Sequence, residues 1–249
     1  MKLKNVISKR SYKTVYVEDG KIIKLFVKGY PKTNVFNEAL NQTRMEGSEI
    51  NVPKVIEVVE IDGCWAFISE EIKGKTLEQL MIENPDKLDE YLDIFIDTQI
   101  LMSKQNSFLL NPLAHRMSRR IARSELRATT RYDFQIRLEE MEQFHEVVHG
   151  DYNPSNIIID DNGKVWVIDW AHVSEGNAAA DVAKTYLWFN LHDQNELSEK
   201  YLKRYVEKSV IEEKFIRNWM PLVAAWILDT ALEEKKSYLR NIVKQEIMR

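Results

Sequence analysis

The chain has 249 residues, 44% of them hydrophobic, which is enough to build one large domain or two small lobes around a packed core. Its 35 Lys and Arg against 39 Asp and Glu give a net charge of −4, which argues against a general nucleic-acid binder. The single cysteine, Cys64, excludes an intramolecular disulfide framework and a cysteine-cluster zinc site. No secretory signal is evident, and the apolar run at 219–228 is far shorter than the roughly 20 residues that span a bilayer. We therefore expect a cytoplasmic globular protein that binds neither nucleic acid nor membrane.

Short β-rich runs fill the first 70 residues. Two pairs of such runs are separated by Asp-Gly, at Asp19-Gly20 and Asp62-Gly63, which is typical of a tight hairpin turn. One segment between the two hairpins has helical spacing. We expect strands at 14–17, 21–26, 55–60 and 64–69, and a helix at 36–45. These elements indicate a small antiparallel sheet accompanied by one helix.

Helical periodicity dominates after Gly74, with one β-hairpin inside it. Asn84-Pro85 is a good helix start, because a capping residue is followed by proline in the first turn. We expect helices at 88–104, after 181 and near 219–232, a short strand at 147–148, and hairpin strands at 157–159 and 164–168. The fold class is therefore α+β, with a strand-rich lobe and connector at residues 1–73 and a larger, mainly helical lobe at 74–249.

Three oxygen-bearing side chains follow strands in the segment 147–170. Asp151 and Asn156 lie on the loop between two predicted strands, and Asp169 ends the next strand. Divalent cations such as Mg²⁺ prefer carboxylate and amide oxygens, shared with water and phosphate oxygens. A carboxylate that does not bind metal can orient a hydroxyl nucleophile or accept its proton. Turn residues of the same types would occur in an ordinary loop, but the pattern favours an oxygen-rich site for a divalent cation.

The same segment resembles a known family. His149-Gly150-Asp151 and Asn156, followed by Ile168-Asp169-Trp170, are similar to the catalytic and metal-binding loops of the aminoglycoside phosphotransferase and choline kinase superfamily. The resemblance implies a bilobal, protein-kinase-like fold that uses ATP and Mg²⁺. It further implies that Asp151 and Asn156 are catalytic, and that Asn156 and Asp169 bind the metal.

The resemblance extends to the nucleotide-binding residues. Lys24 lies where the family's phosphate-pairing lysine does, and Glu38 resembles the helix glutamate that pairs with it. Lys21 is the competing lysine, but Lys24 is preferred because a strand continues after it. Asp181 resembles the aspartate that anchors the catalytic loop from a helix start.

Two further segments of the nucleotide site follow from the resemblance. The connector at 69–74 resembles the one whose backbone holds the adenine, which implies purine contacts near Glu70 and Ile72. The first turn departs from the family because it has no glycine, although Ser8 and Ser11 offer donors and Lys9, Arg10 and Lys13 offer positive charge.

The resemblance implies transfer of the γ-phosphoryl group of ATP to a hydroxyl of a small molecule, with GTP as the alternative nucleotide. A small atypical protein kinase or ATPase is one other interpretation, against which Trp170 argues because protein kinases usually carry Phe-Gly there. A second alternative interpretation is a catalytically silent regulatory domain. A polycationic acceptor is not expected, because residues 181–249 carry a net charge of +1.

Arginines recur at helical spacing between residues 116 and 127. They are Arg116, Arg119, Arg120, Arg123 and Arg127. Acids with the same spacing occur at Asp86, Asp89, Glu90, Asp93 and Asp97. A like-charge stripe needs anions nearby, so we expect the two stripes to face each other at least in part. The alternative is that the arginines bind an anionic acceptor.

Overall fold

The computed structural model describes residues 3–105, 109–142 and 144–247. The chain divides into two compact units, each of which is described by itself. We call Met1–Tyr91 with Pro154–His172 the sheet unit, and Leu92–Asn153 with Val173–Arg249 the helical unit. The β-hairpin that follows Pro154 thus belongs with the N-terminal sheet. The lobe boundary at residue 73 stays a prediction.

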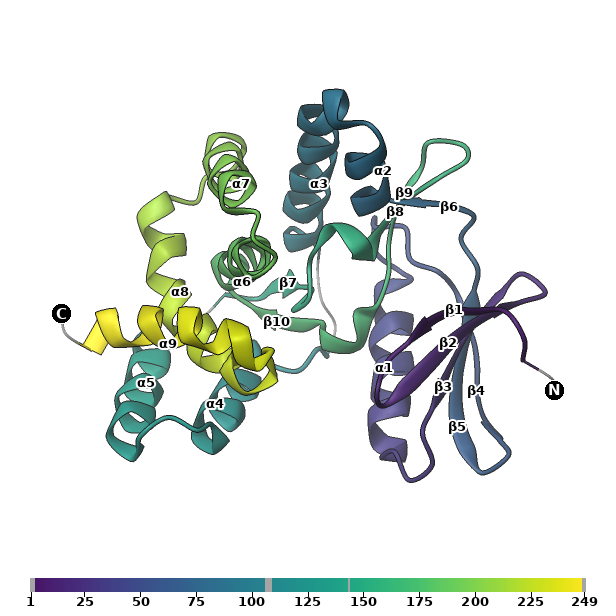
Figure 1. The fold of residues 1–249 in the computed structure, drawn as a ribbon, viewed down its shortest axis with the longest axis horizontal. Coiled ribbons are helices and arrows are strands. Elements are labelled where there is room, and N and C mark those ends of the chain that lie inside the picture. Colours follow the sequence, from purple (N-terminus) through teal and green to yellow (C-terminus); the bar gives the residue numbers. More distant parts are fainter. Residues whose placement is uncertain (1–2, 106–108, 143, 248–249) are drawn as a thin grey trace. The chain divides into compact units, whose positions relative to one another are not determined.

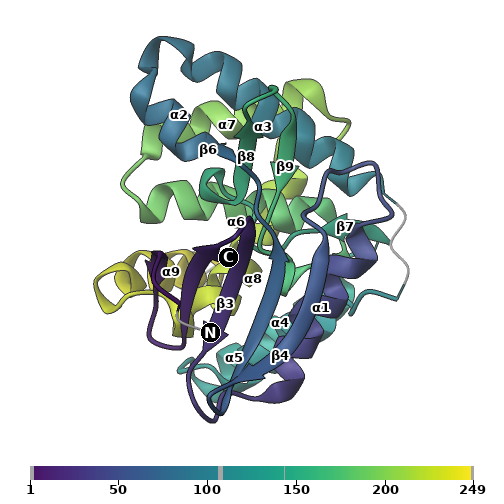
Figure 2. The ribbon, with the colours of Figure 1, turned by 90° about the vertical axis from the view of Figure 1, so that its right-hand side faces the viewer.

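An antiparallel five-stranded sheet in the order β1-β2-β3-β5-β4 dominates the sheet unit. Its strands are β1 (Val6–Lys9), β2 (Lys13–Glu18), β3 (Lys21–Phe26), β4 (Val55–Ile61) and β5 (Cys64–Glu70). Helix α1 (Lys32–Met45) packs against β4 and β5 (Figures 1 and 2). Apolar side chains of the strands and of α1 form the core between them, namely Phe26, Val35, Ala39 and Phe67.

The Asp-Gly turns behave as the sequence predicts. Asp19 and Gly20 have φ of 50° and 73°, and Asp62 and Gly63 have φ of 50° and 76°. Two successive residues with positive φ match the twist of an antiparallel pair, and aspartate and glycine tolerate this conformation. The turns therefore set the register of β2 on β3 and of β4 on β5.

A second, three-stranded sheet in the sheet unit has the order β6-β8-β9. Its strands are β6 (Gly74–Thr76), β8 (Ile157–Asp160) and β9 (Val165–Val167). Gly74 permits the pairing, because a Cβ at this position would lie 2.2 Å from the carbonyl oxygen of Ile159. Helix α2 (Leu77–Glu83) follows β6 directly, and its start is fixed by a capping box between Thr76 and Gln79.

Short 3-10 turns surround the second sheet. They are η1 (Pro85–Lys87), η2 (Pro154–Asn156) and η3 (Trp170–His172). Trp170 is fully buried, and its indole N–H donates to the carbonyl of Val167 at 2.9 Å. Because η3 packs against α1, the segment after β9 is held in place beside the first sheet.

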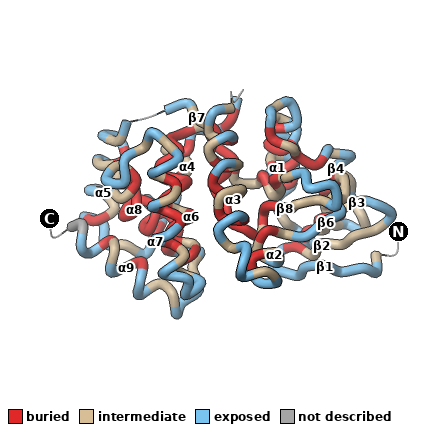
Figure 3. Tube along the Cα trace, turned by 90° about the horizontal axis from the view of Figure 1, so that it is seen from above, coloured by how far each residue is buried: buried red, intermediate tan, exposed pale blue. Residues whose placement is uncertain are grey.

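Helices make up most of the helical unit. They are α3 (Leu88–Ser103), which starts in the sheet unit, α4 (Leu113–Arg123), α5 (Ala128–Glu140), α6 (Ala178–Leu191), α7 (Asn195–Lys208), α8 (Glu213–Ile227), η4 (Leu228–Thr230) and α9 (Glu233–Ile247). Helix α6 packs against α7 and α8, and long stretches of α6 and α8 are buried (Figure 3). A two-stranded ribbon of β7 (Glu146–Val148) and β10 (Ser174–Gly176) adjoins α6 and α4.

The expected α+β fold is confirmed, but two expectations about helices need correction. Helix α4 ends at Arg123, and Arg127 instead occupies the N-cap position of α5, so it leaves the arginine stripe. The pairing expected between this stripe and the acidic stripe is wrong for Asp93 and Asp97. Asp93 lies 3.5 Å from Arg204 and 3.3 Å from Lys208, and Asp97 lies 2.7 Å from Lys208. Basic side chains of α7 thus neutralise these two acids.

Among the residues that the structure describes, no helix combines the length and the apolar character needed to cross a membrane.

Candidate active site

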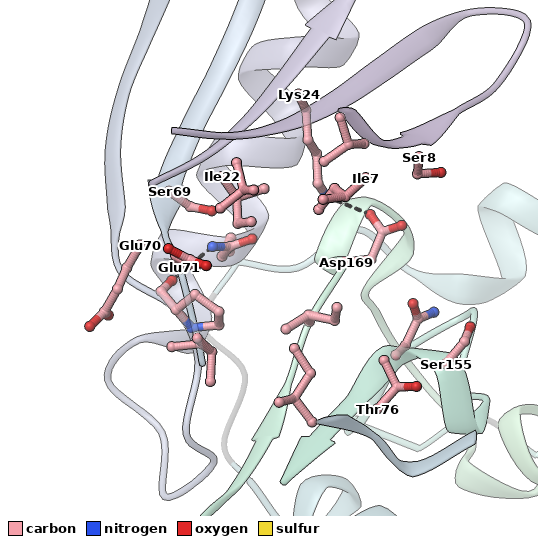
Figure 4. A pocket seen from close by; sticks show the side chains of 18 of the residues that line it. Ile7, Ser8, Ile22, Lys24, Ser69, Glu70, Glu71, Thr76, Ser155 and Asp169 are labelled. Atoms are coloured by element: carbon pink, nitrogen blue, oxygen red, sulfur yellow. Dashed lines mark hydrogen bonds and ion pairs between the residues drawn. The ribbon is translucent and has the colours of Figure 1, made fainter. Parts of the chain in front are cut away.

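A pocket of about 570 Å³ lies within the sheet unit. This volume is typical of sites for nucleotide-sized ligands. Its walls come mainly from β1 to β3, from the end of β5 and the connector after it, from Thr76 and the start of α2, and from η2, β8 and the two residues after β9 (Figure 4). Charged and polar lining residues include Ser8, Arg10, Lys13, Lys24, Glu70, Asn156 and Asp169.

Lys24 joins two carboxylates at the wall of this pocket. Its ammonium nitrogen lies 2.5 Å from Glu38 Oε1 and 2.8 Å from Asp169 Oδ1. Lys13 adds a second cation 3.7 Å from Asp169 Oδ2. Lys24 and Glu38 are almost completely buried. The ion pair expected between Lys24 and Glu38 is therefore present, and Figure 4 shows Lys24 and Asp169 reaching toward each other.

The charges of this cluster hold one another ionised. Burial alone would lower the pKa of Lys24, but the carboxylates of Asp169 and Glu38 outweigh burial and raise it above its usual value. Burial alone would raise the pKa of Asp169, but Lys24 and Lys13 hold it well below its usual range. Burial and the neighbouring Lys24 lower the pKa of Lys13. An added anion beside Lys13 would therefore favour its charged form.

Asp169 has a left-handed backbone, with φ of 63°. Aspartate adopts this conformation at a modest energetic cost, and strain of this kind recurs at functional sites. Buried Trp170 and the packing of η3 on α1 hold the segment in place. The geometry aims the carboxylate at Lys24 rather than along the strand.

The part of the predicted catalytic loop that carries His149, Gly150 and Asp151 lies in the helical unit, whereas Asn156 lies in the sheet unit. The carboxylate of Asp181, in the first turn of α6, accepts the backbone N–H groups of His149 at 3.2 Å and Gly150 at 2.8 Å. Gly150 has φ of 74°, which favours glycine. His149 is fully buried, and its Nδ1 accepts the backbone N–H of Asp151 at 3.3 Å. The expected anchoring role of Asp181 is confirmed by these contacts.

Lys184, one turn further along α6, contacts the same loop. Its ammonium group donates to the carbonyl of Gly150 and lies 3.3 Å from Asp151 Oδ1. Its nitrogen also lies 5.0 Å from the ring centre of Trp226. Sequence reasoning missed Lys184, because a lysine inside a helical pattern gives no indication of what it faces. Asp151 itself is about one-third exposed.

Most residues assigned to the nucleotide site from the sequence line the one pocket. Ser8, Lys24, Glu70, Ile72 and Asn156 all do so, and so does Asp169. Among the described residues, Ser11 and Glu38 do not line this pocket, whereas the basic Arg10 and Lys13, which lie in the same turn as Ser11, do. The turn is tight, because Arg10 N–H donates to the carbonyl of Lys13 at 2.8 Å.

The donors available for a divalent cation fit magnesium. Asn156 offers a nearly buried amide oxygen, and Asp169 offers a carboxylate held ionised by its neighbours. Both line the same pocket, and hard oxygen donors of this kind suit Mg²⁺ when phosphate oxygens and water complete the shell.

Comparison with solved structures shows the same fold in known enzymes. A thermostable mutant of aminoglycoside phosphotransferase APH(4)-Ia, in its apo form, gives a TM-score of 0.73 at 15% sequence identity and covers 98% of this chain and 93% of that one. A variant of that mutant in a ternary complex with AMP-PNP and hygromycin B gives a TM-score of 0.72 at 14% sequence identity. It covers 98% of this chain and 93% of that one. Aminoglycoside phosphotransferase APH(3'')-Id from Streptomyces rimosus, in complex with ADP and streptomycin, gives a TM-score of 0.63 at 15% sequence identity. It covers 86% of this chain and 90% of that one.

No curated protein matches the chain in a sequence search. The model of the phosphotransferase enzyme family matches residues 2–213, which is most of the chain. The match includes the sheet, the connector, the loop at 149–156 and Asp169. The chain belongs to the phosphotransferase enzyme family.

Proposed function

We propose that this protein transfers the γ-phosphoryl group of ATP to a hydroxyl group of a small molecule. The observation that carries the proposal is Lys24, buried between Glu38 and Asp169 at the wall of a 570 Å³ pocket. A lysine held ionised in this way is suited to bind phosphate oxygens, because its charge is fixed in place before the ligand arrives.

The phosphates of ATP would bind among the cations of the pocket. Lys24 would contact the α- and β-phosphates, as the family resemblance implies. Arg10 and Lys13 line the same pocket and would neutralise further charge, which compensates for the missing glycine in the turn after β1. Ser8 also lines the pocket and adds a hydroxyl donor. Positive charge rather than backbone amides therefore covers the phosphates in this protein.

The purine would bind at the connector after β5. The N–H of Glu70 already donates to the carbonyl of Lys54 at 2.9 Å, so a purine contact at Glu70 would go to its carbonyl oxygen. The N–H of Ile72, two residues on, would then be the donor. Adenine presents an amino donor beside a ring-nitrogen acceptor, which matches this pair. Apolar side chains line both sides of the pocket and would cover the ring, namely Val15, Val17, Ile22, Ile158 and Ile168.

The transfer itself requires little covalent chemistry from the protein. The acceptor oxygen forms a bond to the γ-phosphorus while the bond from that phosphorus to the β,γ-bridging oxygen breaks, and ADP leaves. Asp151 orients the acceptor hydroxyl and takes its proton. Asp181 and Lys184 hold the loop that carries Asp151. Asn156 and Asp169 would hold Mg²⁺, which when bound neutralises the phosphate charge.

The closing test measures ADP release from ATP with a library of small hydroxyl compounds, with a protein acceptor, and with neither. We expect turnover with a small hydroxyl compound, and we expect Asp151→Asn to lower that turnover by several orders of magnitude while ATP binding persists. Turnover only with the protein acceptor, or equal turnover without any acceptor, would favour a protein kinase or an ATPase. ATP binding without turnover under any condition would favour a silent regulatory domain.

A further inference from the structure

A second pocket, of about 350 Å³, lies in the helical unit and is lined mainly by arginines. We call it the arginine pocket. Its lining consists of Arg116, Arg119, Arg120 and Arg123 of α4 together with Asp229 and Thr230 of η4. Four arginines against one aspartate give these walls a net charge of +3, in a chain whose total is −4.

The helix presents these arginines by its amphipathic pattern. Leu113, Met117 and Ile121 are buried on one face of α4 and pack it into the helical unit. The arginines follow at positions i, i+3, i+4 and i+7, so they share another face. Like charges at this spacing destabilise an isolated helix by about 0.2–0.5 kcal/mol per pair. An anion in the pocket would remove this repulsion.

Burial disfavours the positive charge of two of these arginines, Arg116 and Arg120. Burial, together with Arg120 and Arg119, lowers the pKa of Arg116 to about 10. Burial also lowers the pKa of Arg120, although Asp229 opposes this. Arg116 is held in place, because its guanidinium donates to Ser174 Oγ at 2.8 Å and to the carbonyl of Val173 at 3.3 Å.

Three acids of the helical unit, Glu125, Asp93 and Asp97, are engaged by cations outside α4. Glu125 Oε1 accepts from Arg240 at 2.5 Å, and Lys236 lies 3.5 Å from its other oxygen. Asp93 and Asp97 pair with α7. Asp229 accepts the backbone N–H of Glu125 at 3.2 Å in addition to lining the pocket. Among the described residues that line the pocket, one carboxylate thus accompanies four guanidinium groups.

Contacts within the helical unit connect the arginine pocket to the catalytic loop. Lys184 lies 3.3 Å from Asp151 and 5.0 Å from the ring of Trp226. Trp226 precedes Asp229 by three residues, or about 5 Å along a helix axis. One lysine, one indole and one helical turn thus connect the pocket with the carboxylate that would activate the acceptor hydroxyl.

We infer that the phosphate acceptor itself carries a phosphate monoester, which Arg116, Arg119, Arg120 and Arg123 bind while its hydroxyl is presented to Asp151. The inference rests on the proposed function. One guanidinium group can donate two parallel hydrogen bonds to a phosphate. A phosphate monoester dianion has three terminal oxygens, so it can accept hydrogen bonds from more than one arginine. The bound ester is unchanged by the reaction, which transfers only the γ-phosphoryl group of ATP.

Binding is tested first, without ATP, by melting curves and calorimetry with glycerol 3-phosphate, with glycerol, and with chloride at matched ionic strength. We expect stabilisation by glycerol 3-phosphate alone, and we expect Arg120→Gln and Arg123→Gln each to abolish most of it. Arg127→Gln is the matched control, because Arg127 belongs to the same sequence stripe but not to the arginine pocket. Stabilisation that survives in both pocket variants would overturn the inference.

Turnover is tested next, by ADP release with matched hydroxyl compounds that carry a phosphate ester, a carboxylate or neither. We expect kcat/KM to be at least about tenfold higher for the phosphate ester, and Arg120→Gln to raise KM about tenfold with kcat nearly unchanged. A preference for the carboxylate or for the uncharged compound would overturn the inference. Absence of turnover with every compound, combined with phosphate-ester binding that depends on Arg120 and Arg123, would contradict the proposed function instead.

Discussion

Asp169→Asn tests the charge cluster and the proposed metal site together. Asp169 contacts Lys24 at 2.8 Å and Lys13 at 3.7 Å, so the substitution leaves two cations facing only Glu38. Breaking a buried ion pair costs about 3–5 kcal/mol. Because Lys24 keeps Glu38 and Asp169 is partly exposed, we expect about 2–3 kcal/mol, which lowers the melting temperature by about 5–10 °C in a chain of this size.

The unfolding free energy that Asp169→Asn removes should depend on pH in one direction. The folded pKa of Asp169 lies below its usual value, so its contribution is fully present above the unfolded pKa of about 3.9. The contribution is lost as the pH falls toward the folded pKa. The difference in unfolding free energy between parent and variant should therefore be constant from about pH 5 to 8 and shrink below about pH 4.

Ligand binding separates the two roles of Asp169. At saturating concentrations Mg²⁺-ATP should stabilise the parent by mass action, about 2.7 kcal/mol at a hundred times Kd. In Asp169→Asn we expect the increment due to Mg²⁺ to vanish, while stabilisation by ATP in EDTA persists because the site is more positive. Asp62→Asn is the matched control, since Asp62 is exposed and also has positive φ. Unchanged stability of the apo variant would refute the electrostatic argument, and a full Mg²⁺ increment would remove Asp169 from the metal site.

Three further predictions concern other parts of the chain. Gly74→Ala should lower the unfolding free energy by about 2–4 kcal/mol in urea titrations, because the added Cβ would overlap the carbonyl of Ile159. Gly47→Ala is the control and should change the unfolding free energy little, because a Cβ at Gly47 would have nothing within 4 Å. Equal stability of the two variants would contradict the close approach. Lys184→Gln should lower kcat by about ten- to a hundredfold with the KM for ATP unchanged, because Asp151 loses the cation that positions it, and Lys184→Arg should recover part of the rate. A change in KM alone would exclude this positioning role. Aminoglycosides should be poor acceptors in the ADP-release assay, because the arginine pocket repels polycations, and efficient phosphorylation of a kanamycin-like compound would contradict this.

Local sequence determined most of the secondary-structure elements and the resemblance to the family. The Asp-Gly turns adopt positive φ as predicted, because their conformational preference is local. The spacing of His149-Gly150-Asp151, Asn156 and Asp169 indicated the family, because these residues form a compact motif that can be read from one short segment of the chain. Helix α1 began four residues earlier than expected, at Lys32 directly after Pro31, because helix ends depend weakly on periodicity.

Contacts between distant segments were decided only by the tertiary structure. Lys24 and Asp169 are 145 residues apart, and their hydrogen bond exists because η3 packs against α1. Lys184 was missed since a helical pattern shows which residues share a face but not what that face meets. The arginine and acidic stripes were expected to pair by charge and spacing, yet α7 supplies the partners of Asp93 and Asp97. Charge complementarity is not directional, so the packing of apolar faces, not the charges, selects which cations the acids meet.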